Sequence, residues 1–476
     1  MAAPGVTVTV RDAAPPRSAP TDTDTWFIAG FTEKGPATPQ LIESLDGYTS
    51  TFGARVSYGQ LYDALDAFFH EGGSKAYVSR VLGPSPVLAT HTFETATATD
   101  SIIVKAKSYG DWGNSLSVEI AHSGSDYTVA VSLSSVLVET SPLLTTQQDA
   151  VDWSDGSAYV DITLGAGTGI PAAATSALST GADDHADAAD TQWAAAINRF
   201  DADLGPGQIS MPGRTTAQSH ADQLAHALAK NRVALLDYTD SGVAATLAAA
   251  AGTDQVGASD RHGGAFAPWA LIPGLAGGTL RTVPYSAVEA GIMARNDQAG
   301  ISPNVPSAGA LYGLAQYAVG LSQAFTDADR AVLNDAGVNA AIVKNGAITT
   351  YGYRTLADPA ADIEHVPLSN ARLEMAIIAE AEAIGDRYVF AQLDGRGFTL
   401  ADFGGDLAGM LQAWYDAGSL YGATAGDAYK VNVGAPINTA DTAAALELNA
   451  QLLVRYSPFG EQVQIFITRT AITEAI

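Results

Sequence analysis

The sequence predicts an α/β (α+β) multidomain protein, with a discontinuous α/β core, an inserted β-rich domain and a C-terminal α+β domain. The chain has 476 residues, more than one typical domain holds. Helical and strand-like apolar spacings alternate along most of it. Between about residues 88 and 185 Thr, Ser, Val and Gly dominate instead, and the earlier pattern then returns. A single insertion into one α/β domain explains both changes.

The first part of the core, residues 21–87, predicts a strand, a helix and a second strand. A short apolar run in 25–36 ends at a Gly-Pro turn and predicts a buried strand. In 57–73 the apolar residues fall three and four apart, and paired glycines supply the C-terminal stop. Residues 75–82 alternate as the second strand. This order is typical of an α/β layer.

The inserted domain, residues 88–185, is rich in predicted strands. Apolar and polar residues alternate in 115–124, 127–133 and 159–165, as they do in half-buried strands. The domain ends at 181–190, a small, acidic and poorly periodic stretch. That composition predicts a solvated linker.

The second part of the core, residues 186–360, returns to mixed helices and strands. The predicted elements, in chain order, are a helix in 215–231, strands in 232–238 and 265–274, and a helix in 307–321. A hairpin is predicted in 338–356, because Asn345-Gly346 is the strongest two-residue turn signal.

The C-terminal domain, residues 361–476, has its own pattern. Its predicted elements are helices in 369–384 and 400–415 and strands in 387–393, 427–433 and 446–458. The chain closes on an alternating stretch that predicts a last strand. The residues of this C-terminal strand are Val463, Gln464, Ile465, Phe466, Ile467 and Thr468.

Residues 1–20 combine a strand with an extended linker. The strand residues are Val6, Thr7, Val8, Thr9 and Val10, with the valines on one face. No hairpin turn follows them, and the next prolines are typical of an extended hinge. These hinge residues are Pro15, Pro16 and Pro20. A second, less clear linker precedes the closing strand. The first strand therefore needs a partner that its own neighbourhood does not offer.

The composition favours a folded protein and excludes several function classes. Hydrophobic residues make up 47% and charged residues 16%, which argues against a disordered chain. Acidic residues outnumber basic ones 51 to 24, so direct contact with nucleic-acid phosphates is not expected. No apolar run approaches the roughly 20 residues that span a bilayer, so no membrane insertion is expected. The absence of cysteine excludes disulfides and thiolate metal sites, and the lack of a secretory-signal pattern predicts synthesis in a cytoplasm.

The sequence predicts no catalytic residue, no cofactor and no metal site. Gly165, Gly167 and Gly169 follow a predicted strand but lack dinucleotide-binding spacing, so a loop of the β-rich domain is the better interpretation. His220 and His226 are six residues apart on one predicted helix, and all eight histidines are expected on the surface or in loops. No carboxylate stands in an apolar setting that would raise its pKa.

Several stretches share an order and spacing that point to a known family. They include 4–12, 27–36, 280–309, 333–343 and 351–356. Together they resemble the tail sheath proteins of contractile-tailed bacteriophages and related contractile injection systems, over nearly the whole chain outside 88–185. The residues at the family's motif positions are Pro284, Ser286, Gly291, Arg295, Asp297, Asn339 and Arg354.

The resemblance implies a structural subunit rather than an enzyme. Such a subunit polymerises helically around an inner tail tube and contracts to drive the tube through a cell envelope, for genome or effector delivery. The resemblance also implies strand-forming arms at both termini that pair with neighbouring subunits. It implies an outward-facing inserted domain, a subtilisin-like but non-catalytic region in 186–360, and a tube-facing C-terminal domain.

The implied partners are further copies of the chain, the inner tube protein, the baseplate and the tail terminator. The implied location is a virion tail or the sheath of an injection particle, assembled in the host cytoplasm. Two other function classes stay open. One is a non-contractile, self-assembling shell protein, and the other is an α/β hydrolase with a β-rich accessory module.

Overall fold

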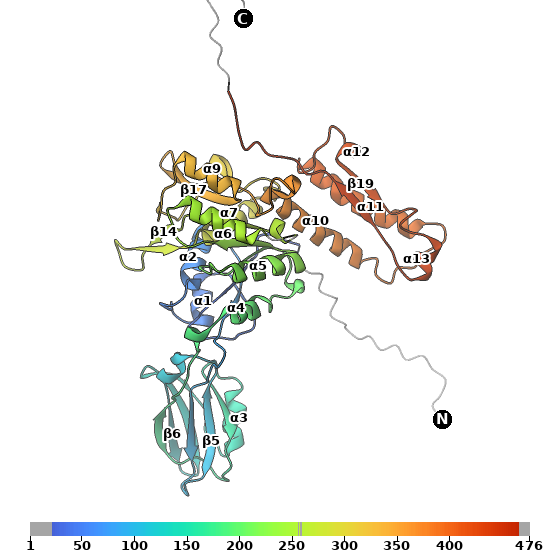
Figure 1. Cartoon of the computed structure of the whole chain (residues 1–476). Coiled ribbons are helices and arrows are strands. Elements are labelled where there is room, and N and C mark those ends of the chain that lie inside the picture. The colour runs from blue at the N-terminus through green and yellow to red at the C-terminus, as the bar shows by residue number, and fades with distance from the viewer. Residues whose placement is uncertain (1–20, 256, 258, 466–476) are drawn as a thin grey trace, which may run out of the picture.

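The computed structural model describes residues 21–255, 257 and 259–465. An eight-stranded sheet lies at its centre, with a β-rich lobe (β4 to β10) at one end and a C-terminal lobe (α10 to β20) at the side (Figure 1). No helix in these ranges is long and apolar enough to cross a membrane.

The central sheet joins strands from both sides of the β-rich lobe. Its order is β18-β17-β13-β12-β11-β1-β3-β2, with parallel pairing from β17 to β3 and an antiparallel strand at each edge. The strands are β1 (Trp26–Gly30), β2 (Gln40–Ile42), β3 (Ala76–Arg80), β11 (Gln208–Ser210), β12 (Val233–Asp237), β13 (Gly263–Ala267), β17 (Val338–Lys344) and β18 (Ala347–Thr350). Because β1 pairs with both β3 and β11, the α/β core is discontinuous in sequence.

Helices cover both faces of the central sheet, so its parallel strands are buried on both sides. Trp26 and Ile28 of β1 face one layer, and Phe27 and Ala29 face the other. The first layer holds α1 (Leu45–Phe52), α2 (Leu61–His70) and α7 (Tyr285–Gln298). The second holds α4 (Asp190–Ile197), α5 (Ala217–Ala229), α6 (Ala244–Asp254) and α9 (Asp327–Asp335).

The β-rich lobe consists of two antiparallel sheets around its own apolar core. One sheet, in the order β10-β6-β7-β8, contains β6 (Leu116–Ser123), β7 (Asp126–Leu133), β8 (Val136–Thr140) and β10 (Ala174–Ala177). The other contains β4 (Thr90–Glu94), β5 (Asp100–Ala106) and β9 (Val160–Leu164), and α3 (Gln147–Ser154) packs beside it. Gly165 and Gly167 lie against the backbone of Asp100 in this lobe.

A fully buried arginine joins the β-rich lobe to the core. The Arg80 guanidinium donates to the carbonyls of Gly35 (3.1 Å) and Tyr109 (2.9 Å), and at longer range to those of Thr32 and Glu33. Three of these carbonyls belong to the core and one, that of Tyr109, belongs to the β-rich lobe, so the buried guanidinium links the two by one hydrogen bond.

The acidic stretch at the end of the β-rich lobe is not the solvated linker that the sequence predicts. Asp183 is 4% exposed and accepts hydrogen bonds from Tyr58 (2.8 Å) and from the His185 ring (2.7 Å). The rings of Tyr58 and His185 stack at 3.5 Å. The stretch is therefore a second fastening between lobe and core, formed by contacts distant in sequence.

The C-terminal lobe packs a two-stranded sheet on two long helices. Its elements are α10 (Leu368–Asp386), α11 (Phe398–Asp416), α12 (Ala425–Ala428), β19 (Tyr429–Asn432), α13 (Ala440–Ala444) and β20 (Gln451–Val454). The strand predicted in 387–393 is wrong: α10 runs on to Asp386, and a turn follows in which Phe390 has φ +65° and a fully exposed side chain.

The helix predicted in 307–321 is also wrong. Only α8 (Gly309–Tyr312) forms there, followed by β16 (Gly320–Leu321), which joins β14 (Ala270–Pro273) and β15 (Leu280–Val283) in a small sheet. The buried carboxylate of Glu71 accepts the backbone N–H groups of Gln316, Tyr317 and Ala318 at 2.6–3.1 Å. Those three donors are therefore used by a side chain rather than by a helical ladder.

Candidate assembly site

The sheet of β19 and β20 has two edges without a strand partner among the described residues. Tyr429 pairs with Val454 and Asn432 with Gln451. One face of the sheet packs on α11, whereas Leu453 on the other is 48% exposed. A sheet of two four-residue strands is marginal on its own, and its unpaired edges can accept further strands.

The hydrogen-bond alternation shows which groups of β20 face its free edge. The Arg455 N–H donates to the carbonyl of Ala428 at 2.9 Å, which continues the pairing with β19. In an antiparallel ladder the backbone groups of alternate residues point to opposite sides. The N–H groups of Leu452 and Val454 therefore point away from β19, toward the free edge of β20.

The root of the N-terminal arm, residues 21–25, is fixed to the core. The Thr23 hydroxyl donates to the Asp297 carboxylate at 2.8 Å, and Gln208 donates to the Thr23 carbonyl at 2.9 Å. Arg372 on α10 also donates hydrogen bonds to both carboxylate oxygens of Asp297, each at 2.7 Å. One carboxylate at the end of α7 thus holds both the arm root and the C-terminal lobe.

The root of the C-terminal arm, residues 457–461, is fixed to the same core. The Ser457 carbonyl accepts from Asn304 at 2.9 Å, and Phe459 packs against the apolar layer that contains α2 and α7. Arg354 then grips the Glu461 carboxylate with two hydrogen bonds of 2.8 and 2.5 Å. These contacts lie in the less clear linker predicted ahead of the closing strand, and its role as a linker stays a prediction.

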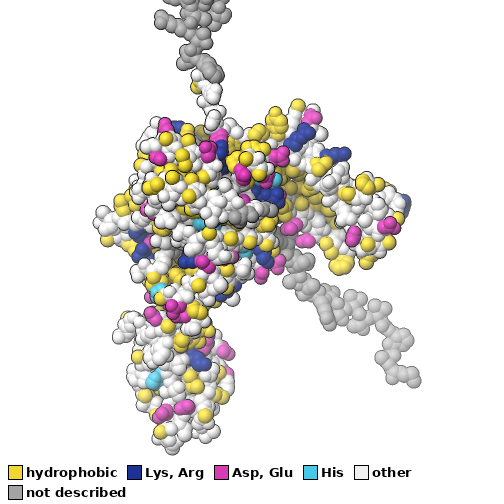
Figure 2. Space-filling view, viewed as in Figure 1, with side chains coloured by type: hydrophobic (Ala, Val, Ile, Leu, Met, Phe, Trp, Pro, Cys, Tyr) yellow, Lys and Arg dark blue, Asp and Glu magenta, His cyan; other side chains and the backbone are white. Residues whose placement is uncertain are grey.

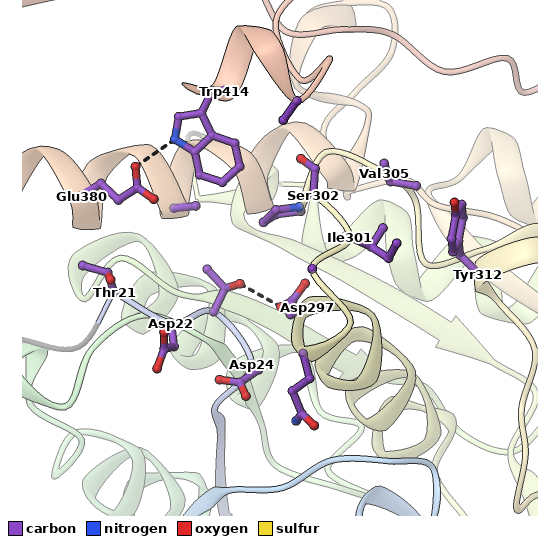
Figure 3. Close-up of a pocket in the computed structure, with 16 residues that line it drawn as sticks. Thr21, Asp22, Asp24, Asp297, Ile301, Ser302, Val305, Tyr312, Glu380 and Trp414 are labelled. Atoms are coloured by element: carbon purple, nitrogen blue, oxygen red, sulfur yellow. Dashed lines mark hydrogen bonds between the residues drawn. The ribbon is translucent and has the colours of Figure 1, made fainter. Parts of the chain in front are cut away.

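A pocket of about 750 Å³ lies between the N-terminal arm root and the C-terminal lobe (Figure 3). Thr21, Asp22 and Asp24 line one side, and Trp414, which donates to Glu380 at 3.0 Å, lines the other. Burial raises the pKa of the Glu380 carboxyl. The described lining holds four carboxylates and no Lys or Arg, so the pocket is unsuited to a nucleotide or another phosphate.

Four of the remaining motif residues hold helix α7 in place. Pro284 stands at its N-cap, and the Ser286 hydroxyl donates to buried Asp237 at 2.8 Å. Gly291 meets α2 so closely that a Cβ would lie 2.5 Å from the Cβ of Glu71. Arg295 donates to the Glu71 carbonyl at 2.6 Å. These contacts bring α7, α2 and β12 into one rigid unit, which both arm roots touch.

Most of the predicted arm residues fall outside the described part of the chain. The residues Val6, Thr7, Val8, Thr9, Val10, Pro15, Pro16 and Pro20 lie outside it, as do Phe466, Ile467 and Thr468. Val463, Gln464 and Ile465 are described; they form no strand here, and Val463 and Ile465 are 81% and 80% exposed. The strand in 463–468 stays a prediction, since a strand needs a partner.

Two sequence predictions about chemistry are wrong. His220 and His226 are 1% and 4% exposed; His220 bonds to Asp254 at 2.7 Å, and burial lowers the pKa of His226 to about 3. Burial also raises the pKa of Glu289 to about 8, although no apolar pattern in the sequence marks it. Within the described residues no group of three or more His, Cys, Asp or Glu is placed to hold a metal ion.

The surface gives no sign of a nucleic-acid groove on the face shown in Figure 2. Lys and Arg side chains are scattered there among acidic ones rather than gathered. The acidic balance of the sequence, with a net charge of -27, agrees with this distribution.

The fold is that of sheath tail proteins. A search of solved structures finds the sheath tail protein of Listeria innocua at a TM-score of 0.61 and 14% identity, covering 88% of this chain and 90% of that one. It also finds the contracted sheath of an extracellular contractile injection system, PVC, at 0.58 and 14%, covering 99% and 98%. The contracted helical sheath of the anti-feeding prophage matches at 0.56 and 16%, covering 99% and 100%. No protein-family model and no curated protein matches the sequence.

Proposed function

We propose that this protein is the structural subunit of a contractile sheath. Copies polymerise helically around an inner tube and contract to drive the tube through a target envelope, delivering a genome or an effector. The observation that carries the proposal is an incomplete sheet, β19–β20, in a chain whose fold is that of sheath proteins.

The incomplete sheet accepts strands from neighbouring subunits. It offers two free edges among the described residues, and the sequence predicts two strand-forming segments, Val6–Val10 and Val463–Thr468. A strand added from each neighbour would form main-chain hydrogen bonds with the outward N–H and C=O groups, so the pairing needs no specific side-chain contact. Pro15, Pro16 and Pro20 form a hinge that lets each subunit rotate while its arm stays paired.

The energy for contraction is stored in the packing of the subunits. The pocket is acidic, which disfavours a nucleotide as fuel. If each subunit buries about 500 Å² more apolar surface after contraction, the gain is on the order of 10 kcal/mol before opposing costs. Summed over many subunits, this difference drives a cooperative change between two packings.

The layout of the chain follows from this role. Residues 88–185 face outward, 21–87 and 186–360 form the non-catalytic core, and 361–476 face the tube. The baseplate is a partner, since the similar structures include an anti-feeding prophage baseplate. The inner tube and a tail terminator complete the set, in a particle assembled in the host cytoplasm.

The test is electron microscopy of the purified full chain and of a chain lacking residues 1–20. We expect hollow tubes of helical subunits from the full chain. We expect a folded monomer from the shortened chain, with the same circular dichroism spectrum. Normal tubes from the shortened chain would contradict the strand-exchange model. Closed shells from the full chain would favour the self-assembling shell protein, and a stable monomer from the full chain would favour the α/β hydrolase.

A further inference from the structure

The predicted C-terminal strand has two possible partners: the free edge of β20 in its own subunit and the sheet of a neighbouring subunit. Only residues 455–462 separate β20 from the predicted strand in 463–468. That is long enough for the strand to turn back and pair with the free edge of β20. Lengthening a loop costs little closure entropy, and a tethered strand acts at roughly millimolar effective concentration. Self-pairing would therefore outcompete a neighbour at ordinary protein concentrations.

The arm root opposes this closure. Phe459 packs on the core, and Glu461 is gripped by Arg354, so the chain is held before the strand begins. Figure 1 shows the last described residues running away from β19 and over the core. A hairpin with β20 would have to pull Glu461 off Arg354.

Arg354 is itself held in place. Its backbone N–H donates to the Asn339 side chain at 2.6 Å, and Asn339 donates back to the Arg354 carbonyl at 2.8 Å. Its remaining guanidinium nitrogen donates to the Asn334 carbonyl at 3.0 Å. The fork is thus preorganised on β17 and its neighbouring turn, and two parallel hydrogen bonds to one carboxylate fix a direction as well as a distance.

We propose that Arg354 and Glu461 form an anchor that keeps the C-terminal strand from capping its own subunit and so leaves it free for a neighbour. Arg354 is a positioning residue for assembly in this scheme, and the inference rests on the proposed function.

The first experiment compares assembly of the full chain with that of Glu461→Ala, Arg354→Glu and the charge swap Arg354→Glu/Glu461→Arg. We expect each single variant to raise the lowest concentration that forms tubes about tenfold, equivalent to about 1.4 kcal/mol, and the swap to restore most of it. Arg330→Glu is the matched control, because Arg330 pairs with exposed Asp327 on α9. Single variants that assemble like the wild type, or a swap that rescues nothing, would overturn the anchor.

The second experiment measures hydrogen exchange in monomers at low concentration. Glu461→Ala should gain protection in 463–468 relative to the wild type, since the released strand pairs with β20. A purely structural role for the ion pair predicts no such gain, and its absence would refute the inference. This measurement does not require tubes. If the wild type forms no tubes, that result counts against the proposed function, and hydrogen exchange alone then tests the anchor.

Discussion

The central sheet and the C-terminal sheet differ in how completely each satisfies its own strands. The central sheet has eight strands, helices on both faces and a short three-residue edge strand, β2. The C-terminal sheet has two strands and one packed face. The first stabilises the subunit, whereas the second presents edge N–H and C=O groups that no strand among the described residues pairs with. In the proposed sheath, folding therefore depends on one sheet and assembly on the other.

The largest expected effect on assembly comes from blocking the incomplete sheet. Val454→Pro removes an N–H that points outward, so the ladder to β19 keeps its bonds while the free edge loses a donor. We expect tube formation to fall at least about tenfold, by sedimentation and microscopy. Val454→Thr is the matched control, since it keeps the N–H and the branched shape. Equal assembly by both variants would show that this edge accepts no strand.

The largest expected effect on stability depends on pH and concerns a buried carboxyl group beside the central sheet. Glu289 of α7 is fully buried and accepts from Thr350 of β18 at 2.6 Å. Burial raises the pKa of its carboxyl to about 8. The folded chain therefore binds a proton that the unfolded chain has lost, and stability falls as pH rises from about 4.5 to about 8.

Glu289→Gln should remove that slope. We expect the variant to exceed the wild type by up to about 4 kcal/mol in unfolding free energy near pH 8, and by little near pH 5. Denaturant unfolding at the two pH values measures the difference. A constant gap between variant and wild type would contradict a titrating Glu289. Tube formation at pH 5 should be unchanged.

A smaller effect on stability is expected when either of two helical glycines is replaced by alanine. In Gly291→Ala the new Cβ would meet Glu71 and the Phe68 carbonyl at 2.5 and 2.9 Å, which should cost about 1–3 kcal/mol. Gly405→Ala on α11 meets open space and should add about 0.5–1 kcal/mol through helix propensity. Thermal unfolding measures both. Similar shifts for the two would mean that α7 and α2 can move apart freely.

Local patterns predicted most of the central sheet and the long helices. The Asn345-Gly346 hairpin is confirmed, with both residues at positive φ, and so are α2, α5, α10 and α11 in their expected places. These elements follow from short-range spacing and turn chemistry.

The contacts that position the arms could not be predicted in the same way. Thr23 with Asp297 and Arg354 with Glu461 join residues 274 and 107 positions apart. The motif marked Asp297 and Arg354, but nothing in the sequence marked Thr23 or Glu461 as their partners. Glu71 likewise redirects 316–318 from helix to loop by a contact across the fold.

If the chain works as the proposed sheath subunit, the junction at Arg80 offers a way to follow contraction. Arg80 with Tyr109 and Tyr58 with Asp183 tie the β-rich lobe to the core at two points, so we expect the lobe to turn together with the core. A small rotation of the core would move the end of the β-rich lobe that lies away from the core through a larger distance. Dyes on neighbouring tips should therefore report each subunit's turn as a change in energy transfer, long before the tube itself is seen to travel.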